Sequence, residues 1–288
     1  MDKDKEMHQS KDSHIIPVTS IASGKGREAA PDVYYYTDQI VNVIFVGLPG
    51  SASWVLIDAG MPGSGKNIIK AAEERFGKGS HPEAIILTHG HFDHVGAIVH
   101  LLETWGDISV YAHPEEFPFL TGKKAYPKPD PFVEGGGLIA KSSFIYPHEP
   151  IDITPVLLPL PHGGTVPRLL GWRWLHTPGH SPGHISLFRE SDRCLIAGDA
   201  FVTVKQSSLY KVIVQKEEVQ GPPRYLTTDW VAAGESVRML NSLKPACAVT
   251  GHGMHMEGKA LAEGLERLAA DFDTIAKPEY GKYVDDSE

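Results

Sequence analysis

A short run rich in metal-binding side chains follows a buried strand pattern, and this run constrains the fold most. Residues 88–94 read THGHFDH, directly after the apolar segment 84–87. A helical pattern follows, with apolar residues on one face at Val95, Ile98, Val99 and Leu102. Sheets of α/β proteins place their chemistry at the carboxyl ends of strands. Three His and one Asp at such a place indicate a metal site rather than a polar turn.

The spacing within this run indicates two neighbouring metal ions. His89 and His91 alternate, so that both side chains can point the same way from extended backbone. Asp93 and His94 lie where the chain turns into the helix, from which they can reach a second position. The remaining ligands must then come from later parts of the chain.

Length and charge exclude some classes of protein. A chain of 288 residues suffices for one large α/β domain or two modest ones. The net charge of -9 argues against nucleic acid as a partner, because that binding depends on clustered Lys and Arg. The two cysteines, Cys194 and Cys247, lie in apolar strand-like runs and are expected to be buried, reduced thiols.

The amino terminus and the hydropathy pattern predict a cytoplasmic protein. No stretch reaches the eighteen apolar residues of a membrane span, so no membrane partner is expected. Residues 1–14 are polar and charged without the apolar region of a secretory signal. We expect 1–30 to be a flexible segment. A homodimer is expected on general grounds only.

The remaining pattern predicts one layered α/β domain over 31–288, built from two similar halves. Expected helices are 66–76, 95–105, 229–243 and a terminal amphipathic helix over 261–275. Expected strands are 34–46, 53–57, 84–87, 108–112, 172–176, 185–188, 194–197 and 246–249. Between about 113 and 170 the chain is rich in Pro, aromatics and Gly, including 135–137. This section is interpreted as a lid-like insertion, with a long connection as the alternative.

Three later segments repeat the arrangement of the first run. Residues 176–184 read HTPGHSPGH, and their Pro and Gly residues would hold His180 in one orientation. The apolar run 194–197 leads to Asp199, and the run 246–249 leads to His252. Each segment therefore delivers a His or an Asp near the end of a strand.

These motifs together resemble the metallo-β-lactamase superfamily, nearest its glyoxalase II-like and lactonase-like hydrolases. The similarity runs from about residue 41 to about 268 and includes Asp58 at a strand end. The resemblance implies a four-layer αβ/βα sandwich. It implies one metal held by His89, His91 and His180, and another held by Asp93, His94 and His252. Asp199 would bridge the two, and Asp58 would support a ligand histidine from behind.

The resemblance also implies the chemistry. Two Zn²⁺ ions, with iron or manganese as alternatives, would deprotonate a bridging water. The resulting hydroxide would attack the carbonyl of an ester, thioester or lactone in a small-molecule substrate. Asp93 or Asp199 would act as the catalytic residue that passes a proton to the leaving group. The additional histidines near these motifs are interpreted as structural: His176, His184 and His255.

Several alternatives remain open within the same resemblance. Quorum-quenching lactonases carry a Tyr three residues after the bridging Asp, where this chain has Val202. The glutathione-binding pattern of glyoxalase II is not reproduced by Lys205, Tyr210 and Lys211. A mononuclear-iron persulfide dioxygenase, a phosphodiesterase of the same fold, and a non-catalytic binding relative are the other readings. The substrate pocket is expected between the aromatics of the middle section and the loop 201–210.

Overall fold

The chain forms two compact units of similar size. The computed structural model describes residues 6–16, 19–20, 22–204 and 217–284. Unit 1 comprises Met1–Tyr126 and Pro147–Leu170, and unit 2 comprises Pro127–Tyr146 and Gly171–Glu288. The expected loop 201–210 lies largely outside the described residues, as do Lys205, Tyr210 and Lys211.

Unit 1 contains a mixed sheet of seven strands that follow one another in chain order. The first four strands pair antiparallel, and the last four pair parallel. The strands are β1 (Lys25–Ala30), β2 (Val33–Asp38), β3 (Val41–Val46), β4 (Val55–Ile57), β5 (Ala84–Ile86), β6 (Ser109–Ala112) and β7 (Leu157–Pro159). Because β4, β5 and β6 are parallel, their carboxyl ends meet at one edge.

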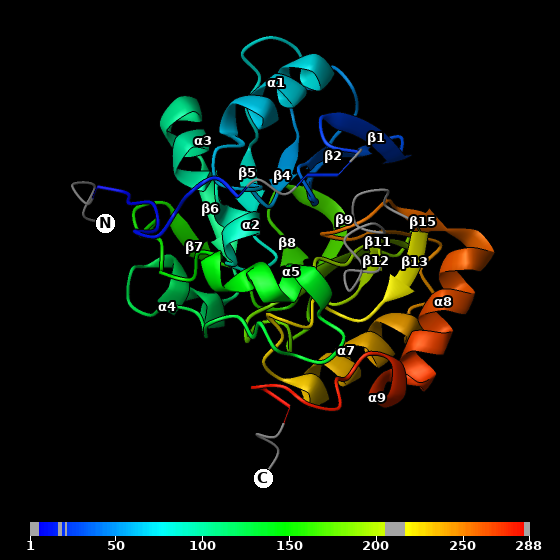
Figure 1. Cartoon of the computed structure of the whole chain (residues 1–288). Coiled ribbons are helices and arrows are strands. Elements are labelled where there is room, and N and C mark those ends of the chain that lie inside the picture. Colours follow the sequence, from blue (N-terminus) through cyan, green and yellow to red (C-terminus); the bar gives the residue numbers. More distant parts are fainter. Residues whose placement is uncertain (1–5, 17–18, 21, 205–216, 285–288) are drawn as a thin grey trace. The chain divides into compact units, whose positions relative to one another are not determined.

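Two helices cover a face of this sheet and share its core. Helices α1 (Gly65–Phe76) and α3 (Ile98–Trp105) contact each other and pack their apolar faces with strand residues (Figure 1). The indole of Trp54 stacks on Phe76 with ring centroids 4.5 Å apart. Gly77 ends α1 at a φ of 107°, a conformation that glycine adopts without strain. The core thus holds in place strands β4 and β5, the second of which leads into the loop that carries the histidines.

The loop after β5 leads into an interrupted helix. The sequence predicted one helix over 95–105, but the structure has α2 (Phe92–Val95) and then α3, separated at Gly96 and Ala97. The Gly96 amide donates to the Gly60 carbonyl at 2.8 Å. A Cβ on Gly96 would lie 2.2 Å from the Pro62 nitrogen. This close backbone approach explains the break, which periodicity alone does not indicate.

Unit 2 contains most of the second sheet. Its strand order is β15-β14-β11-β10-β9-β8, and the boundary between the units falls within β9. Strands β11 and β14 are parallel neighbours, and their other neighbours are antiparallel. A separate pair joins β12 and β13. The strands are β8 (Thr165–Val166), β9 (Leu169–His176), β10 (Ile185–Arg189), β11 (Cys194–Ile196), β12 (Val202–Val204), β13 (Glu217–Gln220), β14 (Cys247–Val249) and β15 (Met256–Glu257).

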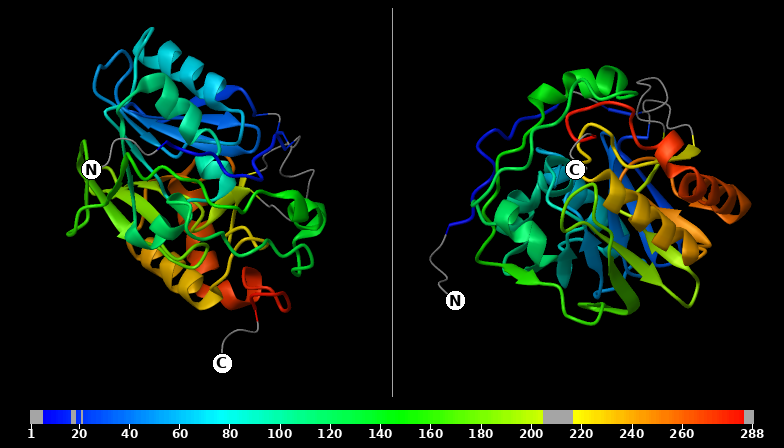
Figure 2. Two further views of the ribbon diagram at one scale, coloured as in Figure 1. Left: turned by 90° about the vertical axis from the view of Figure 1, so that its left-hand side faces the viewer. Right: turned by 90° about the horizontal axis from the view of Figure 1, so that it is seen from below.

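Helices α7 (Trp230–Ser242) and α8 (Gly258–Ala270) pack side by side in unit 2, as both views of Figure 2 show. Their apolar faces join residues of β10, β11 and β14 in one buried cluster. The Asp229 carboxylate accepts a hydrogen bond from the Ala232 amide at 2.9 Å and so caps α7. The terminal helix is shorter than predicted, because α8 ends at Ala270 and α9 (Phe272–Ile275) follows as a separate turn.

The sequence located most strands but resolved their limits poorly. The single run predicted over 34–46 is a hairpin of β2 and β3, which turns at Gln39 with a φ of 55°. Six strands were not predicted: β1, β7, β8, β12, β13 and β15. The middle section holds η1 (Pro114–Glu116), α4 (Phe117–Leu120), α5 (Gly137–Ser142) and η2 (Ser143–Ile145). Its lid role stays a prediction.

We expect Gly96→Ala to destabilise the protein by about 1–3 kcal/mol, because the new methyl group collides with backbone rather than with a mobile side chain. Chemical denaturation would measure the change. Glu103→Ala, on the exposed side of α3, serves as the control and should change stability by about 0.5 kcal/mol or less. Equal stability of both variants would contradict the close approach.

Candidate metal site

Unit 1 gathers four of the predicted ligands in the loop between β5 and α2 and in α2 itself. His89, His91, Asp93 and His94 are each exposed by 4% or less. The His89 ring lies 4.6 Å from the ring of His91 and 4.2 Å from that of His94, measured between centroids. The predicted neighbourhood of these side chains is therefore present within this unit.

Asp58 lies at the end of β4 and holds this loop through three hydrogen bonds. Its Oδ1 accepts from the Thr88 amide at 2.7 Å, and its Oδ2 accepts from the Thr88 hydroxyl at 2.7 Å. The same Oδ2 lies 2.7 Å from Nδ1 of His94. Asp58 adopts a φ of 62°, a left-handed conformation that Asp tolerates better than most residues. Because Nδ1 of His94 is bonded here, Nε2 is the atom that would bind a metal.

Thr88 sets the tautomer of His89 in the same way. Its hydroxyl has one proton, which it donates to Asp58, so it must accept from Nδ1–H of His89 at 3.1 Å. The lone pair of His89 is then on Nε2. A chain from Asp58 through Thr88 thus presents two imidazoles by the same nitrogen, which is how protein metal sites orient histidine.

Glu116 and Tyr126 support the loop, and neither contact was predicted from the sequence. The buried Glu116 carboxylate accepts from the Gly90 amide at 2.9 Å and from the Tyr126 hydroxyl. The Tyr126 ring lies 4.4 Å from that of His91. Burial, followed by the negative charge of Glu116, raises the pKa of Tyr126 well above its usual value. Tyr126 is therefore a neutral hydrogen-bond donor. Only the aromatic content of the middle section could have pointed to it.

Unit 2 gathers the other three predicted ligands. His180, Asp199 and His252 are each exposed by 2% or less. Oδ2 of Asp199 lies 3.5 Å from Nε2 of His180 and 3.2 Å from Nε2 of His252. One carboxylate oxygen thus lies between two imidazoles, an arrangement that suits a bridging ligand.

Thr227 sets the tautomer of His180. Its hydroxyl donates to the Pro223 carbonyl at 2.8 Å, so it must accept from Nδ1–H of His180 at 3.1 Å. The His180 lone pair is therefore on Nε2, the atom nearest Asp199. Thr227 was not identified from the sequence, because it lies 47 positions from His180.

His184 uses both ring nitrogens within the fold. Its Nε2 accepts from the Asp199 amide at 2.9 Å, and its Nδ1 lies 3.0 Å from the Thr177 carbonyl. This supports the structural role assigned to it. His176, also interpreted as structural, bonds the Pro182 carbonyl through Nε2 at 2.8 Å.

His252 is held through its backbone by β12. The Thr203 amide donates to the His252 carbonyl at 3.1 Å, and the Thr250 hydroxyl donates to the same carbonyl at 2.7 Å. A Cβ on Gly253, which has a φ of 100°, would lie 2.4 Å from the Thr203 hydroxyl. Glycine is therefore required directly after His252.

The donor set fits divalent metal ions. It consists of imidazole nitrogens and carboxylate oxygens, which suit zinc, iron and manganese alike. Burial of this many titratable groups in each unit is costly unless a cation balances the carboxylates. The tautomers of His89, His94 and His180 each direct Nε2 for coordination. The site residues of each unit are thus suited to bind a divalent metal ion.

The chain belongs to the metallo-beta-lactamase superfamily, whose family model matches residues 36–252. The probable metallo-hydrolase YflN of Bacillus subtilis is 49% identical over 261 residues, which cover 90% of this chain and 98% of YflN. The probable metallo-hydrolase YybB of the same organism is 31% identical, over 60% of this chain and 65% of YybB. The predicted family and enzyme class, a metal-dependent hydrolase, are thereby confirmed.

A solved structure agrees on the fold. A beta-lactamase domain protein from Burkholderia ambifaria matches with a TM-score of 0.57 at 20% identity, over 93% of this chain and 79% of that one. The predicted α/β metallo-β-lactamase fold class is confirmed by this likeness and by the family match. Among the described residues, no helix is both long and apolar enough to cross a membrane.

We expect Asp58→Asn to weaken metal binding by about 10- to 100-fold, because an amide cannot accept all three hydrogen bonds that the carboxylate accepts. Competition with a chromophoric chelator would measure the affinity. Asp38→Asn is a matched control, since the buried Asp38 bonds Ser64 and Asn67 rather than a predicted ligand. Equal metal affinity in both variants would contradict the role of Asp58.

Proposed function

We propose that the protein is a dinuclear zinc-dependent hydrolase that cleaves the carbonyl bond of a small ester, thioester or lactone. The observation that carries this proposal is the set of fixed tautomers, which leaves Nε2 as the coordinating atom in His89, His94 and His180. A histidine with a merely structural role would use both nitrogens within the fold, as His184 does.

The proposal assigns each ligand to one of two metals. His89, His91 and His180 would hold one ion, and Asp93, His94 and His252 would hold the other. Asp199 would bridge them, which is supported by the position of its Oδ2 between Nε2 of His180 and Nε2 of His252. Iron or manganese could replace zinc, since the same nitrogen and oxygen donors accept them.

The proposal gives different roles in hydrolysis to different residues of the chain. The metal ions would supply a water of lowered pKa and polarise the substrate carbonyl. Asp93 or Asp199 would accept a proton from the attacking water and pass it to the leaving group. Asp58, Thr88 and Thr227 would hold the imidazoles in position, so that no rearrangement of ligands is needed during reaction.

Two other reactions of related chemistry are kept as alternatives. A persulfide dioxygenase would use a single iron with two His and one Asp. The buried Asp93 and His252 beyond such a set favour two metals. A phosphodiesterase is the other alternative. It is disfavoured by the net charge of -9, because polyanionic substrates are attracted by positive charge.

The proposal includes the protein's setting. We infer a single functional domain over 31–288 with 113–170 acting as a lid, cytoplasmic residence and, on general grounds, a homodimer. Cys194 and Cys247 are buried and form no disulfide, in line with the reduced thiols that we propose. No nucleic acid or membrane partner is proposed.

We expect His180→Ala to lose about one metal equivalent per chain, because it removes a ligand, while His184→Ala keeps both metals and mainly loses stability. Elemental analysis of the two purified variants, with thermal melting alongside, would separate these effects. Equal metal content in both variants would overturn the assignment of His180.

We expect the zinc-loaded protein to hydrolyse at least one member of a panel of aryl esters, thioesters and lactones, and to lose that activity on chelation. Re-addition of zinc should restore it. Activity on none of these substrates, together with cleavage of a bis-aryl phosphodiester or oxygen consumption with a persulfide, would replace the proposal by the corresponding alternative.

A further inference from the structure

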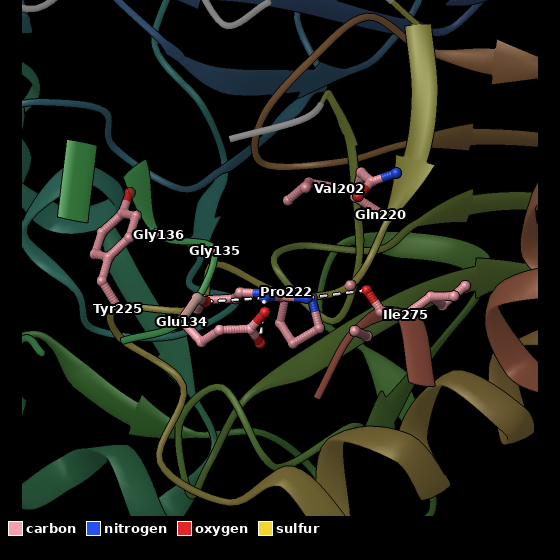
Figure 3. A pocket seen from close by; sticks show the side chains of 11 residues that line it. Glu134, Gly135, Gly136, Val202, Gln220, Pro222, Tyr225 and Ile275 are labelled. Atoms are coloured by element: carbon pink, nitrogen blue, oxygen red, sulfur yellow. Dashed lines mark hydrogen bonds and ion pairs between the residues drawn. The ribbon is translucent and has the colours of Figure 1, made fainter. Parts of the chain in front are cut away.

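Unit 2 contains a cavity of about 280 Å³ that no ligand of the metal site lines. Figure 3 shows Glu134, Val202, Gln220 and Ile275 around it, and Arg224 completes its polar lining. The cavity is small, and it combines apolar side chains with one guanidinium group. Such a combination is typical of a site for a short organic ligand with one charged end.

Arg224 is held rigidly in the wall of this cavity. Nη1 donates to the Glu134 carbonyl at 2.9 Å and to Oε2 of Glu134 at 3.3 Å, while Nη2 donates to the Ile275 carbonyl at 3.0 Å. A guanidinium has five N–H groups, of which these three bonds use three. Nε–H and one Nη2–H remain to donate to a ligand. The Arg224 side chain is 23% exposed. Its Nε and Nη2 edge is the edge that grips a carboxylate in two parallel bonds.

Glu134 orients the guanidinium and also accepts a hydrogen bond from the backbone. Its Oε2 accepts from the Glu279 amide at 2.9 Å as well as from Nη1 of Arg224. The Glu134 carboxylate therefore holds one side of the guanidinium in a fixed position. A single ligand carboxylate can form two parallel bonds to the remaining edge.

Gly135, the first of the three glycines noted in the sequence, makes room for this arginine. A Cβ on Gly135 would lie 2.3 Å from Nη1 of Arg224, and Gly135 has a φ of 69°. Any larger residue at this position would displace the guanidinium and strain the backbone. The position of Arg224 thus explains why residue 135 is a glycine.

The cavity shares its walls with the parts of unit 2 that hold the metal ligands. Arg224 and Thr227 lie on one turn, which is closed by hydrogen bonds from the Leu226 and Thr227 amides to the Pro223 carbonyl. Thr227 bonds Nδ1 of His180. On the other side, Val202 lines the cavity, and its neighbour Thr203 bonds the His252 carbonyl.

These distances suit one substrate that reaches both places. Val202 is three residues after Asp199, so their Cα atoms are at most roughly 11 Å apart. The proposal requires a substrate that has its scissile carbonyl at Asp199 and its far end in the cavity.

We propose that this cavity binds a carboxylate on the substrate, with Arg224 as the specificity-determining residue, so that the enzyme prefers short carboxylate-bearing esters or thioesters to neutral ones. The inference rests on the proposed hydrolase function and names its substrate class. The apolar part of the cavity, Val202 and Ile275, would take the chain between the carboxylate and the scissile carbonyl.

The test compares mono-4-nitrophenyl glutarate with 4-nitrophenyl valerate, which have acyl chains of equal length and differ by the terminal carboxylate. We expect the zinc-loaded protein to favour the glutarate ester by about 10- to 100-fold in kcat/KM, the effect of one bidentate charged pair. Arg224→Gln should bring this ratio close to one. Arg238→Gln, an exposed arginine of α7 paired with Asp273, is the matched control and should keep the ratio.

Gly135→Ala provides a second variant that removes no charge. It should lower the glutarate preference by displacing the guanidinium. Thermal melting would establish that the variants are folded. A preference that survives in both Arg224→Gln and Gly135→Ala, or no preference in the unmodified protein, would overturn the proposal.

A binding measurement separates failure of this inference from failure of the hydrolase function. Calorimetric titration with monomethyl glutarate needs no turnover. We expect the zinc-loaded protein to bind it about 10- to 100-fold more tightly than Arg224→Gln does. Weaker binding by the variant supports the cavity even if no ester is cleaved. Equal binding by both proteins would contradict it, since the carboxylate would then bind elsewhere.

Discussion

The buried carboxylate of Asp58 is the constraint on which the metal loop of unit 1 depends. Asp58 follows strand β4 in a left-handed backbone conformation. Its carboxylate accepts hydrogen bonds from the Thr88 amide, the Thr88 hydroxyl and Nδ1 of His94. Through Thr88 it also decides the tautomer of His89. Because β4 and β5 are parallel neighbours, this single side chain connects the sheet to the ligands. In unit 2 the tautomer of a histidine is set by a hydroxyl instead: that of Thr227, which bonds Nδ1 of His180.

One turn of unit 2 carries both a residue of the proposed specificity site and a residue that supports a proposed metal ligand. Residues 223–227 carry Arg224 into the wall of the cavity and Thr227 to His180. Strand β12 has a comparable double role, since Val202 lines the cavity and Thr203 bonds the His252 carbonyl. A substrate that fills the cavity would therefore touch the same segments that hold the metal ligands. In the proposed mode of binding, the remote charged group would help to position the scissile carbonyl.

The strands that precede the predicted ligands could be read from the sequence, because buried strands leave local apolar runs and the motifs follow them directly. The supporting residues could not. Glu116, Tyr126 and Thr227 act on loops far from them in the chain, and no local pattern marks such contacts. The break at Gly96 was missed for a similar reason: it depends on Pro62, a residue of another segment. The glycines at 135–137 were noted, but the reason for Gly135 became clear only beside Arg224.

The central proposal is that seven His and Asp side chains hold two metal ions. Titration of chelator-stripped protein with zinc, followed by elemental analysis after removal of unbound metal, tests it most directly. We predict close to two zinc ions per chain. Retention of a single ion, and of iron in preference to zinc when both are offered, would contradict the dinuclear assignment and favour the mononuclear-iron dioxygenase instead.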